Sequence, residues 1–200
     1  MNHKQAEAKQ IMRDMLGEDY VKLTLQSIQS TETPHAEEES NIVAKIQLSN
    51  QDNHILLEGS GVGTLDAFFL AMRNRLSEDY PSVKTIVFTS IKAQSIPNSD
   101  LEHPTDAEAE VSLRIRNSYG DDFEFVNRSR SLLRAGLLGL IEATEYFLNS
   151  ELTYIKLYHT LEHYRTQGRS DLVDKYTSLL SMMVRNTSYA EVIERIKSNA

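Results

Sequence analysis

The residues with the clearest chemical potential form a glycine-rich segment in the first half of the chain. Gly59, Gly61 and Gly63 alternate with Ser60 and Val62 and precede a run of apolar residues at helical spacing. Glycines before a helix let the backbone approach a ligand closely, and the free N–H groups at a helix start attract an anion. The carboxylate of a free amino acid is one such anion. The same glycines would also suit a tight, ligand-free strand-to-helix turn, so the residues alone leave both interpretations open.

Two further motif matches fail in their context. His159 to His163 fits the H-x-x-E-H pattern of zinc peptidases, but at helical spacing His163 points almost opposite the apolar stripe of Tyr154 and Leu161. A catalytic zinc also needs a water-excluding cleft and a third protein ligand. The segment 59–64 misplaces the third glycine of a dinucleotide-binding loop and follows a hairpin strand. We predict no metal site and no cofactor.

Positive evidence for catalysis is missing from the sequence. The chain contains no cysteine, which excludes disulfides, thiolate nucleophiles and cysteine-based zinc sites. An acid-rich stretch from Asp100 to Glu108 could hold a cation, although a charged surface loop is the simpler interpretation. No residue pattern suggests a nucleophile beside an oriented base. We therefore predict that the protein is not an enzyme.

Composition narrows the class of partner. The 21 basic and 29 acidic residues give a net charge of −8, and the basic residues are scattered, which argues against nucleic-acid binding. No segment approaches the roughly 20 apolar residues of a membrane span. The polar residues 1–19 lack the apolar core of a signal peptide. These features predict a cytoplasmic protein that contacts neither nucleic acid nor membrane.

The elements that would position the glycine segment follow one plan twice. Alternating apolar residues predict strands, polar stretches predict loops, and apolar residues three or four apart predict helices. The first set comprises strand 21–28, loop 30–41, hairpin strands 42–48 and 54–58, and helix 64–76. The second comprises strand 83–93, loop 97–105, strands 107–116 and 123–126, and helix 131–148. The pattern predicts an α+β fold of two pseudo-symmetric βββα units. One helix covers a sheet face only in part, so we expect the remainder to pack on the other unit or on a second chain.

Helical segments flank this repeat on both sides. A helix over 4–16 is predicted to end at Gly17, a good helix stop. Three more are predicted over 152–166, 170–185 and 188–197, with an apolar face that packs on the chain's own sheets or docks on a partner enzyme. The expected organisation is an N-terminal helix (1–18), a central domain (19–150) and a C-terminal helical extension (151–200).

Three segments carry a resemblance to a known family. Residues 58–69, EGSGVGTLDAFF, resemble the G-x-G-P-V-D-A-L signature of the LeuA allosteric domain, the regulatory and dimerising domain of 2-isopropylmalate synthase and citramalate synthase. Residues 91–93 with 105–111 are similar to that family's A…G-x-D-A-x-A-x-V stretch, and residues 131–136 to its last helix. The resemblance covers about residues 19–150 in the same order. Thr64 departs from the pattern, because the family usually has proline there.

The resemblance implies a regulatory role without the family's catalytic barrel. In the family, the feedback amino acid lies between small-residue strands and the glycine loop, near the dimer interface. The residues that match this arrangement are Gly61, Gly63, Leu65, Asp66, Thr89, Ala93, Asp106 and Ala107. The resemblance thus implies a stand-alone homodimer that binds a small branched-chain amino acid and has a separate barrel enzyme as a possible partner. The alternative is a structural or protein-interaction module that kept the fold but lost the ligand pocket.

Overall fold

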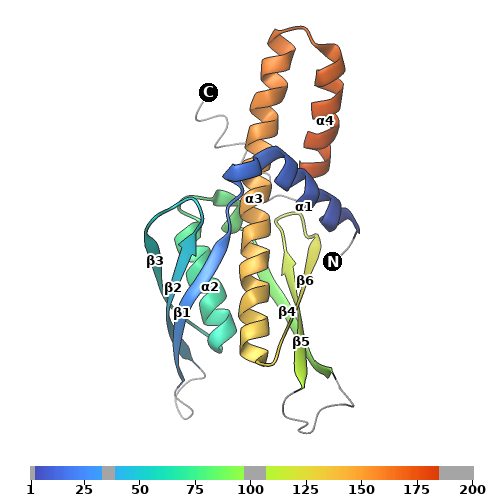
Figure 1. Ribbon diagram of the computed structural model, residues 1–200. Helices are drawn as coiled ribbons and strands as arrows, with labels where there is room; N and C mark the ends of the chain where they lie inside the picture. The colour runs from blue at the N-terminus through green and yellow to red at the C-terminus, as the bar shows by residue number, and fades with distance from the viewer. Residues whose placement is uncertain (1–2, 33–38, 97–106, 185–200) are drawn as a thin grey trace.

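The computed structural model describes residues 3–32, 39–96 and 107–184, and this part of the chain has an α+β fold (Figure 1). The helices and strands alternate in the order that the sequence predicts. In chain order they are α1 (His3–Leu16), η1 (Gly17–Asp19), β1 (Leu23–Glu32), β2 (Ser40–Leu48), β3 (His54–Gly61), α2 (Thr64–Leu76), η2 (Pro81–Val83), β4 (Val87–Ile96), β5 (Glu108–Arg116), β6 (Asp122–Ser129), α3 (Leu132–Thr166) and α4 (Ser170–Val184).

The predicted internal repeat is confirmed. Strands β1-β2-β3 form one antiparallel sheet and β4-β5-β6 form a second, and a helix follows each sheet. The repeat extends to an irregularity: the register of β1 shifts between Leu25 and Ser27, and that of β4 shifts between Phe88 and Ser90. Because β-bulges are specific features of a strand pair, equivalent residues of the two units can be matched by counting from these positions.

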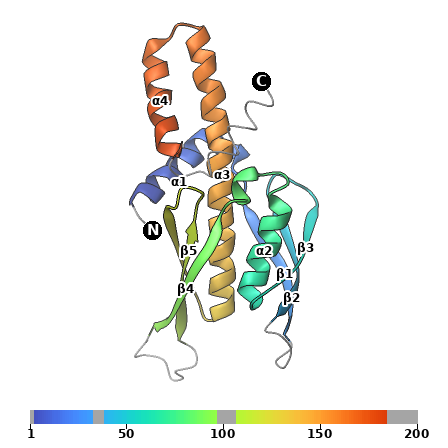
Figure 2. The same ribbon diagram turned by 180° about the vertical axis from the view of Figure 1, so that it is seen from behind.

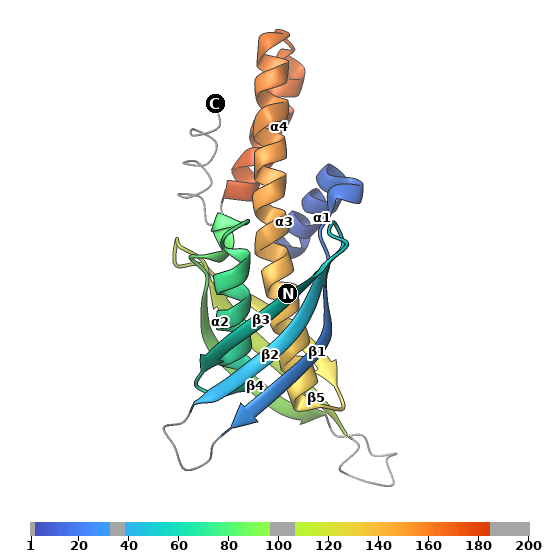
Figure 3. The ribbon, with the colours of Figure 1, turned by 90° about the vertical axis from the view of Figure 1, so that its left-hand side faces the viewer.

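Alternating burial explains why the sheets face inward. In β2, Ile42, Ala44 and Ile46 are buried while Val43 and Lys45 between them are exposed, as a strand with one covered face requires. Helix α2 packs on β2 and β3, α3 packs on β5 and β6, and the two helices contact each other. The sheets therefore lie on opposite sides of α3 (Figures 1 and 3), and buried residues of both units form one core.

The predicted break between helices 131–148 and 152–166 is wrong. Helix α3 runs without interruption for 35 residues, which is roughly 52 Å at 1.5 Å per residue. The polar residues Asn149, Ser150 and Glu151, which lie between the two predicted helices, are all fully buried within α3. Their side chains face other parts of the chain, where Asn149 and Glu151 bind backbone groups of residues 21 and 82. Tertiary contacts thus account for polar residues that helical propensity alone disfavours.

Several predicted strand limits also need correction. Strand β6 spans Asp122–Ser129 where residues 123–126 were predicted, β4 ends at Ile96 instead of residue 93, and β2 begins at Ser40, inside the predicted loop. Strand β1 continues through Glu32, which pairs with Ser40, although residues 30–32 were expected in a loop. Strand β3 continues to Gly61, so its last glycines belong to the sheet. Strand β4 begins at Val87 instead of residue 83, because the chain first forms η2 after Pro81. Backbone hydrogen bonds to the neighbouring strand decide these ends, whatever the polarity of the side chains.

The terminal helices extend one end of the domain. Helix α1 ends at Leu16 as predicted, where Gly17 takes a φ of +57°. Helix α4 spans the predicted range and forms a hairpin with α3 that projects beyond the sheets (Figure 2). Its apolar residues pack on the chain's own helices, with Met183 fully buried and Tyr176 stacked on Tyr164 at 5.4 Å between ring centres. The predicted helix 188–197 lies outside the described residues.

Candidate functional site

The glycine segment joins the end of β3 to the start of α2 at very close range. A Cβ atom on Gly59 would lie 2.9 Å from the Ala71 Cβ. One on Gly61 would lie 2.5 Å from Asp66 Oδ2 and 2.7 Å from the Ala67 nitrogen. Gly63 precedes the helix with a φ of +90° and would meet no atom within 4 Å. Close packing therefore requires the first two glycines, and backbone conformation favours the third.

We predict that Gly61→Ala lowers the free energy of unfolding by about 1–3 kcal/mol, because the added methyl group collides with backbone that has no room to shift. Urea unfolding followed by far-UV circular dichroism measures the loss. Ser60→Ala, a change at the exposed neighbouring residue, is the matched control and should stay within about 0.5 kcal/mol. Unchanged stability of Gly61→Ala would contradict the explanation that close packing requires this glycine.

Polar side chains of the protein already occupy the start of α2. The Asp66 carboxylate accepts a hydrogen bond from the Val62 N–H at 3.0 Å, so this acid binds the connection that precedes its helix, where a negative charge is favourable. The Thr64 hydroxyl donates to Glu32 Oε1 at 3.0 Å and lies 2.6 Å from the Ser30 hydroxyl. Ser40 donates to the same Glu32 oxygen at 3.1 Å. The first unit thus closes this helix start with its own hydroxyl and carboxylate groups.

The corresponding place in the second unit has smaller side chains, and the Ser131 hydroxyl caps the start of α3 by accepting from the Arg134 N–H at 3.2 Å. Counting from the bulges, Ser30 corresponds to Ala93 and Glu32 to Ser95. Their strand partners Ser40 and Ala109 correspond to each other, and the first helical residues are Thr64 and Leu132. Ala93 pairs with Val111, which is fully buried, yet Ala93 itself is exposed. Ser30 is exposed as well, so both edge strands are uncovered here, and the two units differ in the side chains that they place at this position.

The predicted ligand residues fall into two groups at one end of the molecule. Gly61, Gly63, Leu65 and Asp66 surround the start of α2, while Thr89, Ala93 and Ala107 lie on or beside β4 and β5. Both helices start at this end, toward which β3 and β4 run (Figure 1); we call it the helix-start end. Asp106 lies outside the described residues. Among the described residues, no hydrogen bond joins the two groups.

Two of these residues have structural partners of their own. Leu65 packs across to α3, where a Cβ on Gly136 would lie 2.7 Å from Leu65 Cδ1. Thr89 occupies the bulge of β4, and its hydroxyl donates to the Arg114 carbonyl oxygen at 3.1 Å. Ala93 and Ala107 remain the residues of the set with small side chains beside uncovered strand surface.

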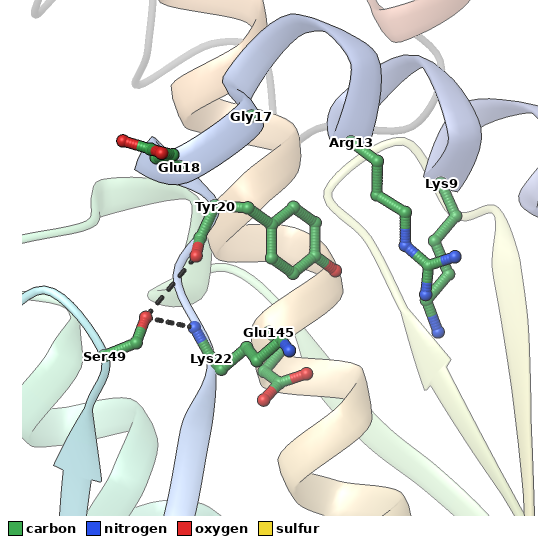
Figure 4. A pocket seen from close by; sticks show the side chains of 8 residues that line it. All are labelled: Lys9, Arg13, Gly17, Glu18, Tyr20, Lys22, Ser49 and Glu145. Atoms are coloured by element: carbon green, nitrogen blue, oxygen red, sulfur yellow. Dashed lines mark hydrogen bonds between the residues drawn. The ribbon is translucent and has the colours of Figure 1, made fainter.

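A second candidate site, which the sequence did not reveal, lies where α1 meets the start of β1 (Figure 4). The cavity has a volume of about 580 Å³, within the range of small-molecule sites. We call it the basic pocket. It is lined by Lys9, Arg13, Gly17, Glu18, Tyr20, Lys22, Ser49 and Glu145. Only the placement of Lys9 and Arg13 one helical turn apart hints at it in the sequence, since Glu145 comes from α3, far along the chain.

Side chains of α3 and of the β2–β3 connection hold the wall of this pocket in place. Asn149 accepts from the Val21 N–H at 2.8 Å and donates to the Val21 carbonyl at 2.7 Å. The Ser49 hydroxyl accepts from the Lys22 N–H at 2.9 Å (Figure 4). Glu145 accepts the Leu23 N–H. Burial raises the pKa of Glu145 and of Tyr20, and the Glu145 charge adds to the rise at Tyr20.

A comparison of the sequence with models of known protein families identifies the family of this chain. A family model described as LeuA allosteric (dimerisation) domain matches residues 3–148. The chain belongs to this family. No curated protein matches the chain. The match includes α1, all six of the described strands, α2 and the first half of α3. It ends within α3, and the rest of that helix and α4 lie beyond it.

The family match gives the role of the matched domain. The matched domain is a regulatory and dimerisation domain, as the resemblance implied. None of the described helices has the length and apolarity of a membrane span. Within the described ranges no three His, Cys, Asp or Glu residues gather as metal ligands would, and both His159 and His163 lie on exposed surface of α3.

Proposed function

We propose that this LeuA domain is a regulatory homodimer that binds a small branched-chain amino acid at the helix-start end and passes the signal to a catalytic barrel. The family match supports regulation and dimerisation. The exposed strand surface at Ala93 supports a ligand, because the side chains that bind one another at the equivalent place in the first unit have smaller or apolar counterparts here. An amino acid would place its apolar side chain against Ala93 and Ala107, with its carboxylate toward the start of a helix.

Exposed apolar side chains support a second chain at the same end. Ile91 is 44% exposed although its strand partner Leu113 is fully buried. Leu132 and Leu133 at the start of α3 are 53% and 42% exposed. Large apolar residues gathered on uncovered surface mark interaction sites. A twin chain covering them would also close the proposed ligand site on its open side.

The test is thermal unfolding in the presence of leucine, isoleucine and valine. A ligand that binds only the folded state stabilises it by RT ln(1 + [L]/Kd). At a concentration one hundred times Kd we expect a rise in Tm of roughly 5–10 °C for a chain of this size. The rise should depend on dose, and D-leucine should give much less.

The matched variant for this experiment is Ala93→Phe, which covers the exposed strand surface and leaves the strand backbone unchanged. It should keep the Tm of the free protein within about 2 °C and lose the response to all three amino acids. Light scattering on the same samples should give the mass of two 22.8 kDa chains. If none of the amino acids changed the Tm of the original protein, the ligand proposal would be wrong.

One set of contacts favours the alternative, an interaction module without a ligand. Packing accounts for Gly59 and Gly61, and Asp66 binds the Val62 N–H of the preceding connection. A dimer that shows no thermal response would fit this alternative. A monomer would contradict both, because each assigns the uncovered apolar surface to a second chain.

A further inference from the structure

The basic pocket has features of a ligand site and lies apart from the helix-start end. It is formed where α1 crosses the domain, at the end from which the α3–α4 hairpin projects (Figures 1 and 4). None of the residues that line it belongs to the predicted amino-acid site. A ligand here would therefore bind at a place distinct from the proposed effector site.

Two of the three cationic side chains that line the pocket have no ion pair with the described residues, while the carboxyl groups of Glu18 and Glu145 line it as well. Lys9 is paired with Glu142 at 2.7 Å. Arg13 and Lys22 have no carboxylate within ion-pair distance in residues 3–32, 39–96 or 107–184. The Arg13 guanidinium and the Lys9 ammonium group extend to the same side, and the Tyr20 hydroxyl points toward them (Figure 4). Three donors thus face one region of the cavity.

The pocket wall is rigid before any ligand arrives. Gly17 turns the chain sharply out of α1 with a φ of +57°. Beyond it, residues 20–23 are held by the side chains of Ser49, Asn149 and Glu145. Their hydrogen bonds fix the backbone on both sides of Tyr20.

We propose that the basic pocket binds a small organic carboxylate. The Arg13 guanidinium donates two hydrogen bonds to the carboxylate in a bidentate arrangement. The Lys9 ammonium group and the Tyr20 hydroxyl are the other donors. The Glu145 carboxyl group, which faces the same cavity, accepts a hydrogen bond from a hydroxyl or amino group on the neighbouring carbon. The chemistry of recognition is thus a carboxylate with a polar substituent at the adjacent position. This inference does not depend on the proposed effector function.

The experiment is an NMR titration of the isotopically labelled full chain with lactate, pyruvate and L-alanine. These probes share a three-carbon carboxylate and differ in the hydroxyl, keto or amino group beside it. We expect saturable shifts in the backbone amides of residues 17–22 and none in those of residues 61–66. Lactamide, which keeps the shape of lactate but lacks the charge, should give no shift. Lactate and alanine should bind more tightly than pyruvate, which offers Glu145 no donor.

Variants separate the site from a general effect of charge. Arg13→Gln should weaken binding at least about tenfold, because a charged hydrogen bond is lost. Arg114→Gln, which removes an exposed arginine from β5, should bind as the original protein does. Both changes are at exposed residues, and circular dichroism checks that the fold is kept. The proposal is overturned if no probe saturates the amides of residues 17–22 at concentrations on the order of tens of millimolar, or if both variants bind equally.

Discussion

Replacing Asn149 by alanine is expected to lower the free energy of unfolding by about 2–5 kcal/mol. The Asn149 side chain is fully buried and holds both the N–H and the carbonyl of Val21. Val21 is itself 1% exposed, so water cannot replace the missing partner. Each buried backbone group left without a hydrogen bond costs about 1–3 kcal/mol. Urea unfolding followed by circular dichroism gives the difference directly.

The control for this prediction is Asn74→Ala, on exposed surface of α2. It removes the same side chain from a helix without a buried partner and should change stability by less than about 0.5 kcal/mol. The consequence of Asn149→Ala should also reach the basic pocket, since Val21 follows Tyr20 directly. A loss below 1 kcal/mol, or carboxylate binding that is unaffected, would show that Asn149 does not position this wall.

Local periodicity was sufficient to predict the repeated units. The alternation from Ile42 to Leu48 indicates one covered face, and the structure buries those same residues. The helix over residues 64–76 was predicted with its observed limits, because apolar spacing and the preceding Gly63 both mark its start. Such features depend on near neighbours in the chain, where the sequence carries most of the information.

The continuity of α3 could not be predicted, because it depends on partners that are distant in the chain. Asn149 and Glu151 lie between the two predicted helices, and they bind the backbone of Val21 and Ser82 across the fold. The basic pocket was missed because α1 and α3 bring Lys9 and Glu145 together from opposite parts of the chain. A pattern read along the chain carries no signal for such pairs.

For the glycine segment, the sequence indicated the local conformation but not the distant contacts. Its composition left a tight strand-to-helix turn and a ligand site both open, and the structure shows a tight turn in which Gly63 takes a positive φ directly before α2. The partners of Gly59 and Gly61, on the next helix, could not be inferred from spacing. The ligand residues proposed from the resemblance remain a prediction, and the exposed strand surface at Ala93 concentrates it on the second unit.

Replacing Tyr146 by alanine is expected to cost about 3–5 kcal/mol, the usual range for a large aromatic side chain removed from a packed core. Tyr146 is 1% exposed, and its ring centre lies 5.5 Å from Phe123 and Phe147 and 5.8 Å from Phe125. Contacts of Tyr146 with Phe123 and Phe125 of β6 pack α3 against the second sheet. Because α3 continues unbroken into the hairpin with α4, loosening it should also raise amide hydrogen exchange in residues 152–166.

Tyr146→Phe separates the ring from its hydroxyl. Burial raises the pKa of Tyr146, so the hydroxyl is neutral in the folded protein near pH 7, and its removal should cost at most about 1.5 kcal/mol. If both variants lost the same stability, the hydroxyl and not the aromatic cluster would hold α3. If Tyr146→Ala destabilised the sheets but left exchange in residues 152–166 unchanged, the hairpin would be stable independently of the LeuA domain. Signals from an effector at the helix-start end could then not travel along α3 to the hairpin, because the two halves of the helix would be uncoupled.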